Sequence, residues 1–177
     1  MSVAPDGPDD RRAVDAFLRG RDEAAFDVLY GRHTPKLMGL ALRLSAGDEP
    51  QAAEIVQEAW VRALPQLGRF RWQSSLSTWL GAFVVNVWRE ESRRRARGAG
   101  DWEVELGTAG VAETPGLAVD VTRAIEALPP GFRSVLVLYG VYGYTHDEIG
   151  KMLGIASGTS KSQLSRARAA LRRALGK

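Results

Sequence analysis

Residues 144–173 constrain the fold more than any other part of this chain. Thr145 can cap a helix, and Glu148 follows at the three-residue spacing of a capping box. The short helix predicted there ends at Gly154, a residue suited to the left-handed conformation at a helix C-terminus. Ser157 can then cap a second helix, which has leucines along one face. Two helices joined by a tight glycine turn are typical of a helix-turn-helix, whose second helix enters the DNA major groove.

The end of the chain that contains this motif is basic throughout. No Asp or Glu follows Glu148. The cations after it are Lys151, Lys161, Arg166, Arg168, Arg172, Arg173 and Lys177. Cations that neutralise DNA phosphates release counterions and so provide affinity for DNA of any sequence. The alternative is a solvated basic tail on an ordinary helical hairpin, and the local sequence alone leaves this alternative open.

The bulk composition is that of an ordinary soluble globular protein, with 45% hydrophobic residues, 25% charged residues and a net charge of only +3. A chain of 177 residues fits one mid-sized domain or two small ones. The N-terminus lacks an apolar secretory core, and no apolar run approaches the roughly 20 residues that span a bilayer. We therefore expect a cytoplasmic protein with no membrane insertion of its own.

Motifs for catalysis or cofactor binding are missing from the sequence. There is no cysteine, which excludes disulfides and thiolate metal sites, and there is no glycine-rich phosphate-binding loop. Neither His33 nor His146 has a second ligand at a suitable spacing. Asp147 and Glu148 are better explained as favourable charges at a helix N-terminus than as an acid–base pair. We therefore predict that the protein is not an enzyme and that it needs no metal or other cofactor.

The hydrophobic pattern predicts an all-α fold made of two small helical domains. Apolar residues recur at helical spacing in both halves, and no strand pattern occurs. We expect a disordered N-terminus at residues 1–8, a first domain at 9–97, a flexible, acidic, Gly-rich linker at 98–117 and a second domain at 118–177. Pro35 stands inside a predicted helix and removes a backbone donor, so a kink or a break is expected near His33.

Two further stretches of the first domain carry charged or aromatic groups. Glu54, Glu58 and Arg62 form a stripe at four-residue spacing, which is typical of a solvated helix face with one weak ion pair. The loop predicted at residues 65–77 places Phe70 and Trp72 beside arginines. Such aromatic side chains can stack on single-stranded bases or fold back on the core, and both interpretations stay open.

The helix predicted after this loop, from residue 76 or 78 to about 97, has a mixed surface. Next to its apolar stripe lies a flank that is aromatic at one end and basic along the rest: Trp79, Ala82, Asn86, Arg89, Arg93 and Arg97. A groove that is cationic along one side and aromatic at one end suits a nucleic-acid strand.

Both halves, in this order, resemble a sigma factor of bacterial RNA polymerase of the small extracytoplasmic-function (ECF) type, in the sigma-70 family. The resemblance to region two lies in three segments: AAFDVLYGRHTPKLMGLALRL, AAEIVQEAWVRALPQLGRFR and SLSTWLGAFVVNVWREESRRRAR. The resemblance to region four lies in one: AIEALPPGFRSVLVLYGVYGYTHDEIGKMLGIASGTSKSQLSRARAALRRAL. Together they cover the chain from about Asp10 to Leu175.

The resemblance implies binding roles for residues in both halves. Contact with the clamp helices of the largest polymerase subunit would involve Glu54, Gln57, Glu58 and Arg62, which revises the solvated-face interpretation. The minus-ten element, as a melted strand with one base flipped out, would bind Arg69, Arg71, Trp72, Ser74, Ser75, Thr78, Trp79, Asn86, Arg89 and Arg93. The minus-thirty-five element would bind Thr159, Ser160, Lys161, Ser162, Gln163, Ser165, Arg166, Arg168 and Arg172. The flap of the second largest subunit and an anti-sigma protein are further partners that the resemblance implies.

This chain departs from the family pattern at three positions. Ser160 replaces a usual valine, and Gln163 replaces a usual arginine on the recognition helix. Gln163 could pair with an adenine, so these departures bear on promoter sequence and affinity. Ala53 replaces an acidic residue common just before Glu54, so the polymerase contact is expected to rest more on Glu54 and Glu58.

Two other classes of function compete with a promoter-specificity subunit. A stand-alone helix-turn-helix regulator would bind duplex DNA with the second half alone and would not need the loop at residues 69–77. A nucleic-acid enzyme, such as a recombinase with an attached DNA-binding end, would need a nucleophile with supporting arginines or metal-binding carboxylates. The sequence has no such cluster.

Overall fold

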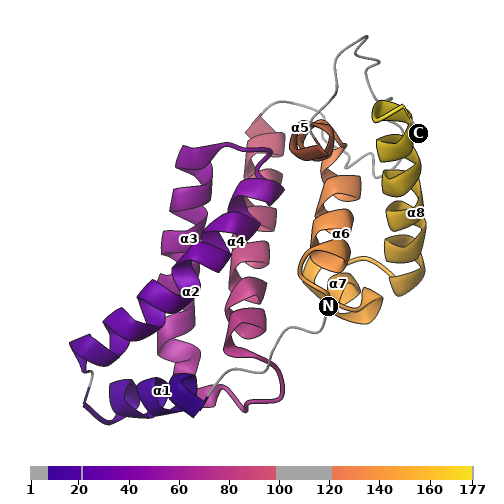
Figure 1. The fold of residues 1–177 in the computed structure, drawn as a ribbon. Helices are drawn as coiled ribbons and strands as arrows, with labels where there is room; N and C mark the ends of the chain where they lie inside the picture. The colour runs from indigo at the N-terminus through magenta and orange to yellow at the C-terminus, as the bar shows by residue number, and fades with distance from the viewer. Residues whose placement is uncertain (1–7, 21, 99–120, 177) are drawn as a thin grey trace.

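The structure is a computed structural model that describes residues 8–20, 22–98 and 121–176 of the chain. All regular elements in these ranges are helical, which confirms the predicted all-α fold. The elements are α1 (Pro8–Gly20), α2 (Glu23–Leu44), α3 (Glu49–Ala63), the 3-10 helix η1 (Leu64–Arg69), α4 (Leu76–Gly98), α5 (Val121–Glu126), α6 (Pro130–Gly140), α7 (His146–Leu153) and α8 (Ser157–Ala174). Helices α1–α4 form one group and α5–α8 a second group beside it (Figure 1). The predicted disordered N-terminus and linker lie outside the described residues, except for Pro8 and Gly98, which belong to helices.

Local sequence signals explain the start of α2 and both ends of α7. Asp22 Oδ1 accepts hydrogen bonds from the backbone nitrogens of Ala24 and Ala25 and so caps α2. The capping box of Thr145 and Glu148 is present at the start of α7, and Gly154 ends that helix with φ 68°. The predicted capping box and the predicted left-handed Gly154 are therefore confirmed.

Three local predictions need correction. The predicted break near His33 is absent: helix α2 continues through Pro35, because buried residues before and after it, including Leu29 and Leu40, hold both parts against the same core. Ser157 does not cap α8; Ala156 takes the cap position and makes no side-chain hydrogen bond. The first part of the predicted loop at residues 65–77 is the helix η1.

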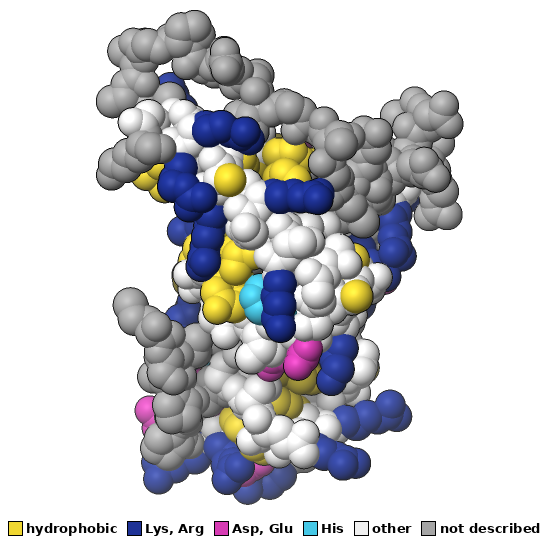
Figure 2. Space-filling view, turned by 90° about the vertical axis from the view of Figure 1, so that its right-hand side faces the viewer, with side chains coloured by type: hydrophobic (Ala, Val, Ile, Leu, Met, Phe, Trp, Pro, Cys, Tyr) yellow, Lys and Arg dark blue, Asp and Glu magenta, His cyan; other side chains and the backbone are white. Residues whose placement is uncertain are grey.

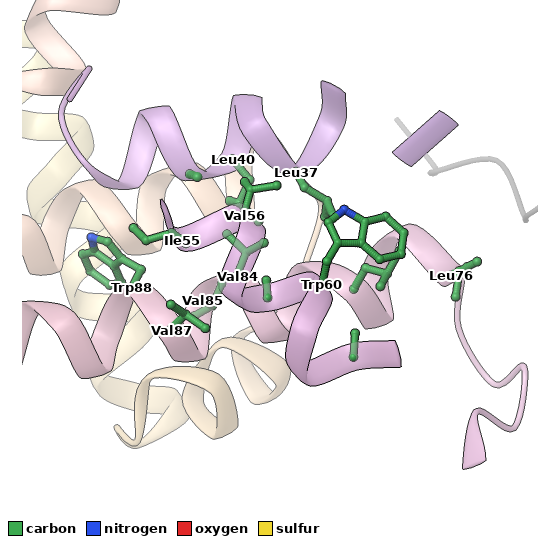
Figure 3. Close-up of a cluster of buried hydrophobic side chains, with 14 of the residues drawn as sticks. Leu37, Leu40, Ile55, Val56, Trp60, Leu76, Val84, Val85, Val87 and Trp88 are labelled. Carbon is green, nitrogen blue, oxygen red and sulfur yellow. The ribbon is translucent and has the colours of Figure 1, made fainter. Parts of the chain in front are cut away.

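The core of the first half lies between α2, α3 and α4. Leu40 from α2, Val56 from α3 and Val84 from α4 are almost completely buried and belong to one cluster (Figure 3). At one end of this cluster, Trp60 Nε1 donates a 3.0 Å hydrogen bond to Thr34 Oγ1, which satisfies the polar edge of the buried indole ring. The three helices therefore form a fixed frame for the residues at their surfaces.

The second half packs directly on the first. Helix α6 lies against α2 and α7 lies against α4, and Val135, Leu138 and Ile149 extend the core of the first half. Polar contacts cross the same boundary: Arg133 Nη2 donates to Leu44 O over 3.2 Å, and Tyr142 Oη donates to Lys36 O over 3.3 Å. Burial lowers the pKa of Arg133. The boundary is therefore a packed interface and not a loose encounter of two surfaces.

Candidate nucleic-acid interface

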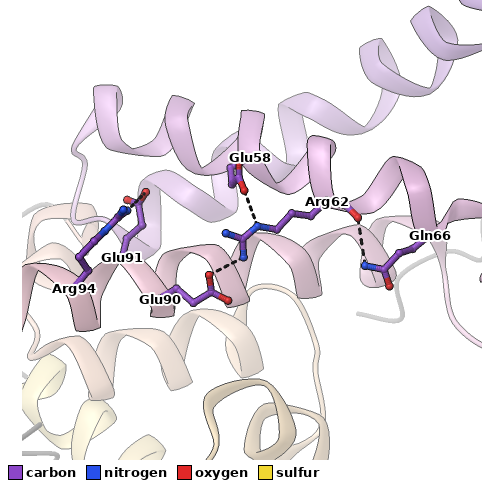
Figure 4. Close-up of polar contacts among 6 residues, drawn as sticks. All are labelled: Glu58, Arg62, Gln66, Glu90, Glu91 and Arg94. Carbon is purple, nitrogen blue, oxygen red and sulfur yellow. Dashed lines mark hydrogen bonds and ion pairs between the residues drawn. The ribbon is translucent and has the colours of Figure 1, made fainter.

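A charged surface joins α3 to α4. Arg62 Nε donates to Glu58 Oε1 over 2.7 Å, and Arg62 Nη1 donates to Glu90 Oε2 over 2.6 Å, so one guanidinium bridges the two helices (Figure 4). The hydrogen bonds, first to Glu58 and then to Glu90, raise the pKa of Arg62. Glu54 and Gln57 line the same hollow, so the structure brings together all four residues predicted to contact the polymerase. Glu90 is the member of this surface that sequence reasoning missed.

A row of four aromatic side chains begins in the segment after η1 and continues into α4. Ring centroids lie 4.8 Å apart for Phe70 and Trp72, 5.1 Å for Phe70 and Trp79, and 4.8 Å for Trp79 and Phe83. All four are half-buried and pack against the main core. One side of the row therefore folds back on the core, as one of the two interpretations of the sequence proposed. The exposed parts of the same rings remain available for stacking on bases. Trp72 adopts φ 56°, a left-handed conformation that is unfavourable for a side chain of this size.

Hydroxyl groups organise the start of α4. Ser75 Oγ accepts from the backbone nitrogen of Thr78 over 3.0 Å and lies 2.8 Å from Thr78 Oγ1, which caps the helix. Ser77 Oγ lies 3.0 Å from Nδ1 of the buried His33 on α2. Two of the predicted minus-ten residues, Ser75 and Thr78, therefore have structural contacts of their own, whereas Ser74 is exposed.

The flank of α4 predicted to bind DNA is partly covered by the second half. Tyr144 Oη donates to Thr78 O over 3.0 Å, and Arg89 Nη1 donates to Met152 O over 2.8 Å. Burial, followed by the charge of Arg93, lowers the pKa of Arg89. The other predicted members with side chains at the surface are Arg69, Arg71, Asn86 and Arg93, all exposed.

Helix α8 presents a basic surface to solvent. The exposed predicted residues are Lys161, Ser162, Ser165, Arg166, Arg168 and Arg172, and Thr159 is half-buried. Lys and Arg side chains are spread over this side of the molecule in Figure 2. The exposed surface of α8 thus has the composition expected for contact with DNA phosphates and bases.

Ser160 and Gln163 point away from that surface. They are 0% and 1% exposed, so neither can reach DNA in this conformation. Ser160 Oγ lies 2.9 Å from His146 Nδ1, and Gln163 lines a cavity between the halves with Trp88 and Arg89. The spacing along α8 already placed both residues near the leucine face, which is the signal that could have identified them as inward-facing.

Sequence reasoning also missed an aromatic pair next to α8. Tyr139 and His146 stack with ring centroids 4.5 Å apart, and the Arg168 guanidinium lies 5.8 Å from the Tyr139 ring centroid. Together with Lys161 and Arg172 they line one polar hollow. The basic surface therefore extends from α8 towards the end of α6 and the start of α7.

Within the described residues no cluster of His, Cys, Asp and Glu is arranged to hold a metal ion. Among the described helices, none has the length and apolar character needed to cross a bilayer.

Comparison with known proteins matches both halves to one family. The model for Sigma-70 region 2 matches residues 29–98, and the model for Sigma-70, region 4 matches residues 118–171. The ECF RNA polymerase sigma factor SigM of Mycobacterium tuberculosis is 36% identical over 94% of this chain and 85% of its own length. The ECF RNA polymerase sigma-E factor of Escherichia coli is 28% identical over 92% of each chain.

Solved structures with the same fold include two that are complexes with another protein. The sigma factor RpoE of Bartonella quintana, in complex with the anti-sigma factor NepR, has a TM-score of 0.64 and 27% identity over 85% of this chain and 96% of its own. CnrH, in complex with the cytosolic domain of CnrY, has a TM-score of 0.60 and covers 95% of this chain and 97% of its own, at 22% identity.

Proposed function

Since this chain belongs to the ECF sigma factors of the sigma-70 family, we propose that it directs RNA polymerase to specific promoters as a non-catalytic subunit. The observation that carries the proposal is the presence of two separate nucleic-acid surfaces in one chain. One is the aromatic row with the basic flank of α4, and the other is the basic surface of α8. A regulator that used the second half alone would leave the first surface without a role, so that alternative is not favoured.

Each surface is assigned one part of the promoter. The exposed face of α8 binds the minus-thirty-five element in the major groove, with Lys161 and Arg166 near base edges and Arg168 and Arg172 on phosphates. The aromatic row and the basic flank of α4 bind the minus-ten element as a single strand with one flipped base. Flipping costs a few kcal/mol, which stacking on Trp72 and pocket contacts offset, so melting needs no ATP.

The polymerase contact is assigned to the charged surface between α3 and α4. Glu54, Gln57, Glu58 and Arg62 line one hollow, and no residue of α8 lines it, so this surface can be occupied while α8 contacts DNA. Arg62 holds Glu58 and Glu90 in fixed positions and thereby prepares the surface for a partner helix. We also assign the flap of the second largest subunit to the second half, and the cytoplasm as the place where the complex works.

Binding of the minus-ten strand requires the two halves to separate. Thr78 and Arg89 are held by Tyr144 and by Met152 O in the described arrangement, so α7 must leave α4 before a strand can reach that flank. The RpoE and CnrH structures are complexes with NepR and CnrY. By analogy, we propose that an anti-sigma protein binds this chain and favours a closed arrangement.

Run-off transcription with core polymerase and genomic promoter fragments tests the proposed function. The chain is expected to form a stable complex with the core enzyme and to give discrete transcripts. Glu58→Lys should abolish complex formation while leaving binding to duplex minus-thirty-five DNA unchanged. Arg166→Ala should weaken binding to duplex minus-thirty-five DNA while leaving complex formation with the core enzyme unchanged. Neither a complex nor a specific transcript from any promoter fragment would show that the proposal is wrong.

A further inference from the structure

Helix α1 lies before the part of the chain that the region 2 model matches, which begins at residue 29. It packs against α2 and η1 at the end of the first half where α4 begins (Figure 1). Three of its residues make the contacts that matter here: Arg11 with the segment between η1 and α4, Leu18 with η1, and Asp10 with α2. Leu18 Cδ2 lies 3.6 Å from where a Cβ on Gly68 would be, so α1 covers the backbone of η1 directly.

Arg11, which is exposed, contacts the side chain of Trp72. Its guanidinium carbon lies 5.0 Å from the centroid of the Trp72 ring, within the range of a cation–π interaction. The backbone of Trp72 has φ 56°, and such a conformation persists only where neighbouring groups hold it. Phe70, at 4.8 Å between ring centroids, is the second neighbour of the ring. Arg11 and Phe70 together therefore fix the orientation of Trp72.

Asp10 acts on Ser77, at the start of α4, through the buried His33. Asp10 and His33 are 3% and 1% exposed, and Asp10 Oδ2 lies 3.3 Å from His33 Nε2. Asp10 Oδ1 accepts from Arg32, which offsets the charge of the carboxylate. A carboxylate beside Nε2 favours the proton on that nitrogen, so Nδ1 is left to accept from Ser77 Oγ at 3.0 Å. The Asp10–His33 contact is electrostatic, because His33 Nε2 makes no hydrogen bond, and together with the His33–Ser77 hydrogen bond it links α1 to the first turn of α4.

We infer that α1 braces the segment at residues 70–77, and that Asp10 and Arg11 are positioning residues for recognition of the minus-ten strand. The inference rests on the proposed function of that segment. The two ties reach its two ends, Trp72 through Arg11 and Ser77 through His33. A segment held at both ends samples fewer conformations when free, so less ordering is required when a base enters its pocket. Removing a tie should lower affinity for the strand and discrimination of the flipped base, without changing polymerase binding.

The test uses holoenzyme assembled from core polymerase and the full chain. The probe is a fluorescent single-stranded oligonucleotide with the minus-ten sequence mapped by run-off transcription, together with the same oligonucleotide changed at the flipped base. Arg11→Ala and Ser77→Ala are each expected to weaken binding of the matched oligonucleotide about two- to fivefold, with a smaller loss for the changed one. Arg11→Lys should restore much of the loss. Arg12→Ala removes the same charge one residue further along α1, and it should stay within twofold of wild type.

The results separate the brace from other roles. If Arg11→Ala weakens both oligonucleotides equally and also flattens the dependence of affinity on salt, Arg11 binds a phosphate itself and the inference is wrong. If Arg11→Ala and Ser77→Ala match wild type in affinity and discrimination, α1 has no positioning role, although the proposed function stands. If wild-type holoenzyme binds no minus-ten oligonucleotide, the proposed function of the segment fails instead. Thermal unfolding of each variant confirms that the compared chains are folded.

Discussion

Gly81 provides a way to separate the two halves with one added carbon atom. It lies in α4 beneath Tyr144, which is 4% exposed, and a Cβ at this position would lie 2.4 Å from Tyr144 Oη. The tyrosine ring is rigid, so it must move back by about 1 Å to reach an ordinary contact distance. That movement stretches the 3.0 Å hydrogen bond from Tyr144 Oη to Thr78 O beyond a useful length. Gly81→Ala should therefore destabilise the closed arrangement.

The size of the effect follows from two contributions. Loss of the hydrogen bond costs about 0.5–1.5 kcal/mol. Forcing an extra carbon into a packed contact costs about 1–3 kcal/mol more. The sum, about 1.5–4.5 kcal/mol, would shift the balance between closed and open halves at least tenfold towards the open state. The replacement also favours helix α4 by about 1 kcal/mol, but that gain is common to both states and cancels from their difference.

Tyr144→Phe is the matched control, because it removes the atom that clashes. The next atoms that the new Cβ would meet are Leu40 Cδ2 at 3.5 Å and Tyr144 Cζ at 3.7 Å, both ordinary contacts. Gly81→Ala should therefore have little effect in a Tyr144→Phe background. The assay is energy transfer between dyes on Glu23→Cys and Arg173→Cys, one in each half, which is simple in a chain with no native cysteine. Unchanged energy transfer in Gly81→Ala, or an equal change with and without the Tyr144 hydroxyl, would refute the reasoning.

Three further predictions concern the turn, a buried histidine and the polymerase surface. A Cβ at Gly150 would lie 2.8 Å from the backbone oxygen of Ile155, so Gly150→Ala should destabilise the helix-turn-helix by about 1–3 kcal/mol. Thermal unfolding measures this loss, and a melting temperature equal to or above that of wild type would contradict the prediction. Burial lowers the pKa of His33 below 6.5 in the folded protein, despite the opposing effect of Asp10, so the stability that neutral His33 contributes is present above pH 6.5 and is lost as the pH falls through the folded-state pKa. The melting temperature should therefore fall more between pH 7.5 and 5 in wild type than in His33→Gln. Parallel curves of melting temperature against pH for the two proteins would argue against this. Arg62→Ala should change stability by less than about 1 kcal/mol, because its ion pairs lie near the surface, yet it should weaken binding to core polymerase in a pull-down titration.

Features that depend on neighbouring residues in the sequence were predictable. The capping box at Thr145 and the left-handed Gly154 are set by the local backbone and need no knowledge of the rest of the fold. The ion pair of Glu58 with Arg62 follows from the four-residue spacing in a helix. The same spacing could not reveal Glu90, because that residue meets Arg62 only after α3 and α4 have packed together.

Features that depend on tertiary contacts were not predictable from local patterns. Pro35 carries an intrinsic cost inside a helix, yet packing on both sides of it keeps α2 continuous. Ser160 and Gln163 were assigned to DNA by residue type, although their spacing along α8 indicated an inward orientation; only the groups that they meet there, His146 and the cavity beside Arg89, depend on the tertiary fold. The role inferred for Arg11 depends on Trp72, a residue 61 positions further along the chain whose position only the three-dimensional arrangement supplies.

The same groups serve the contact between the halves and the proposed contact with DNA. Arg89 donates to Met152 O in the closed arrangement, and it is also a predicted ligand of the minus-ten strand. Gln163 is on the recognition helix but lies in the cavity beside Arg89, where no described protein atom pairs with its amide. A buried amide without a protein partner costs free energy, which weakens the closed state relative to an open state in which the amide is solvated or bound to DNA. Under the proposed function, closure and binding of the minus-ten strand therefore compete for Arg89, so a ligand that binds one arrangement better than the other shifts the balance between them.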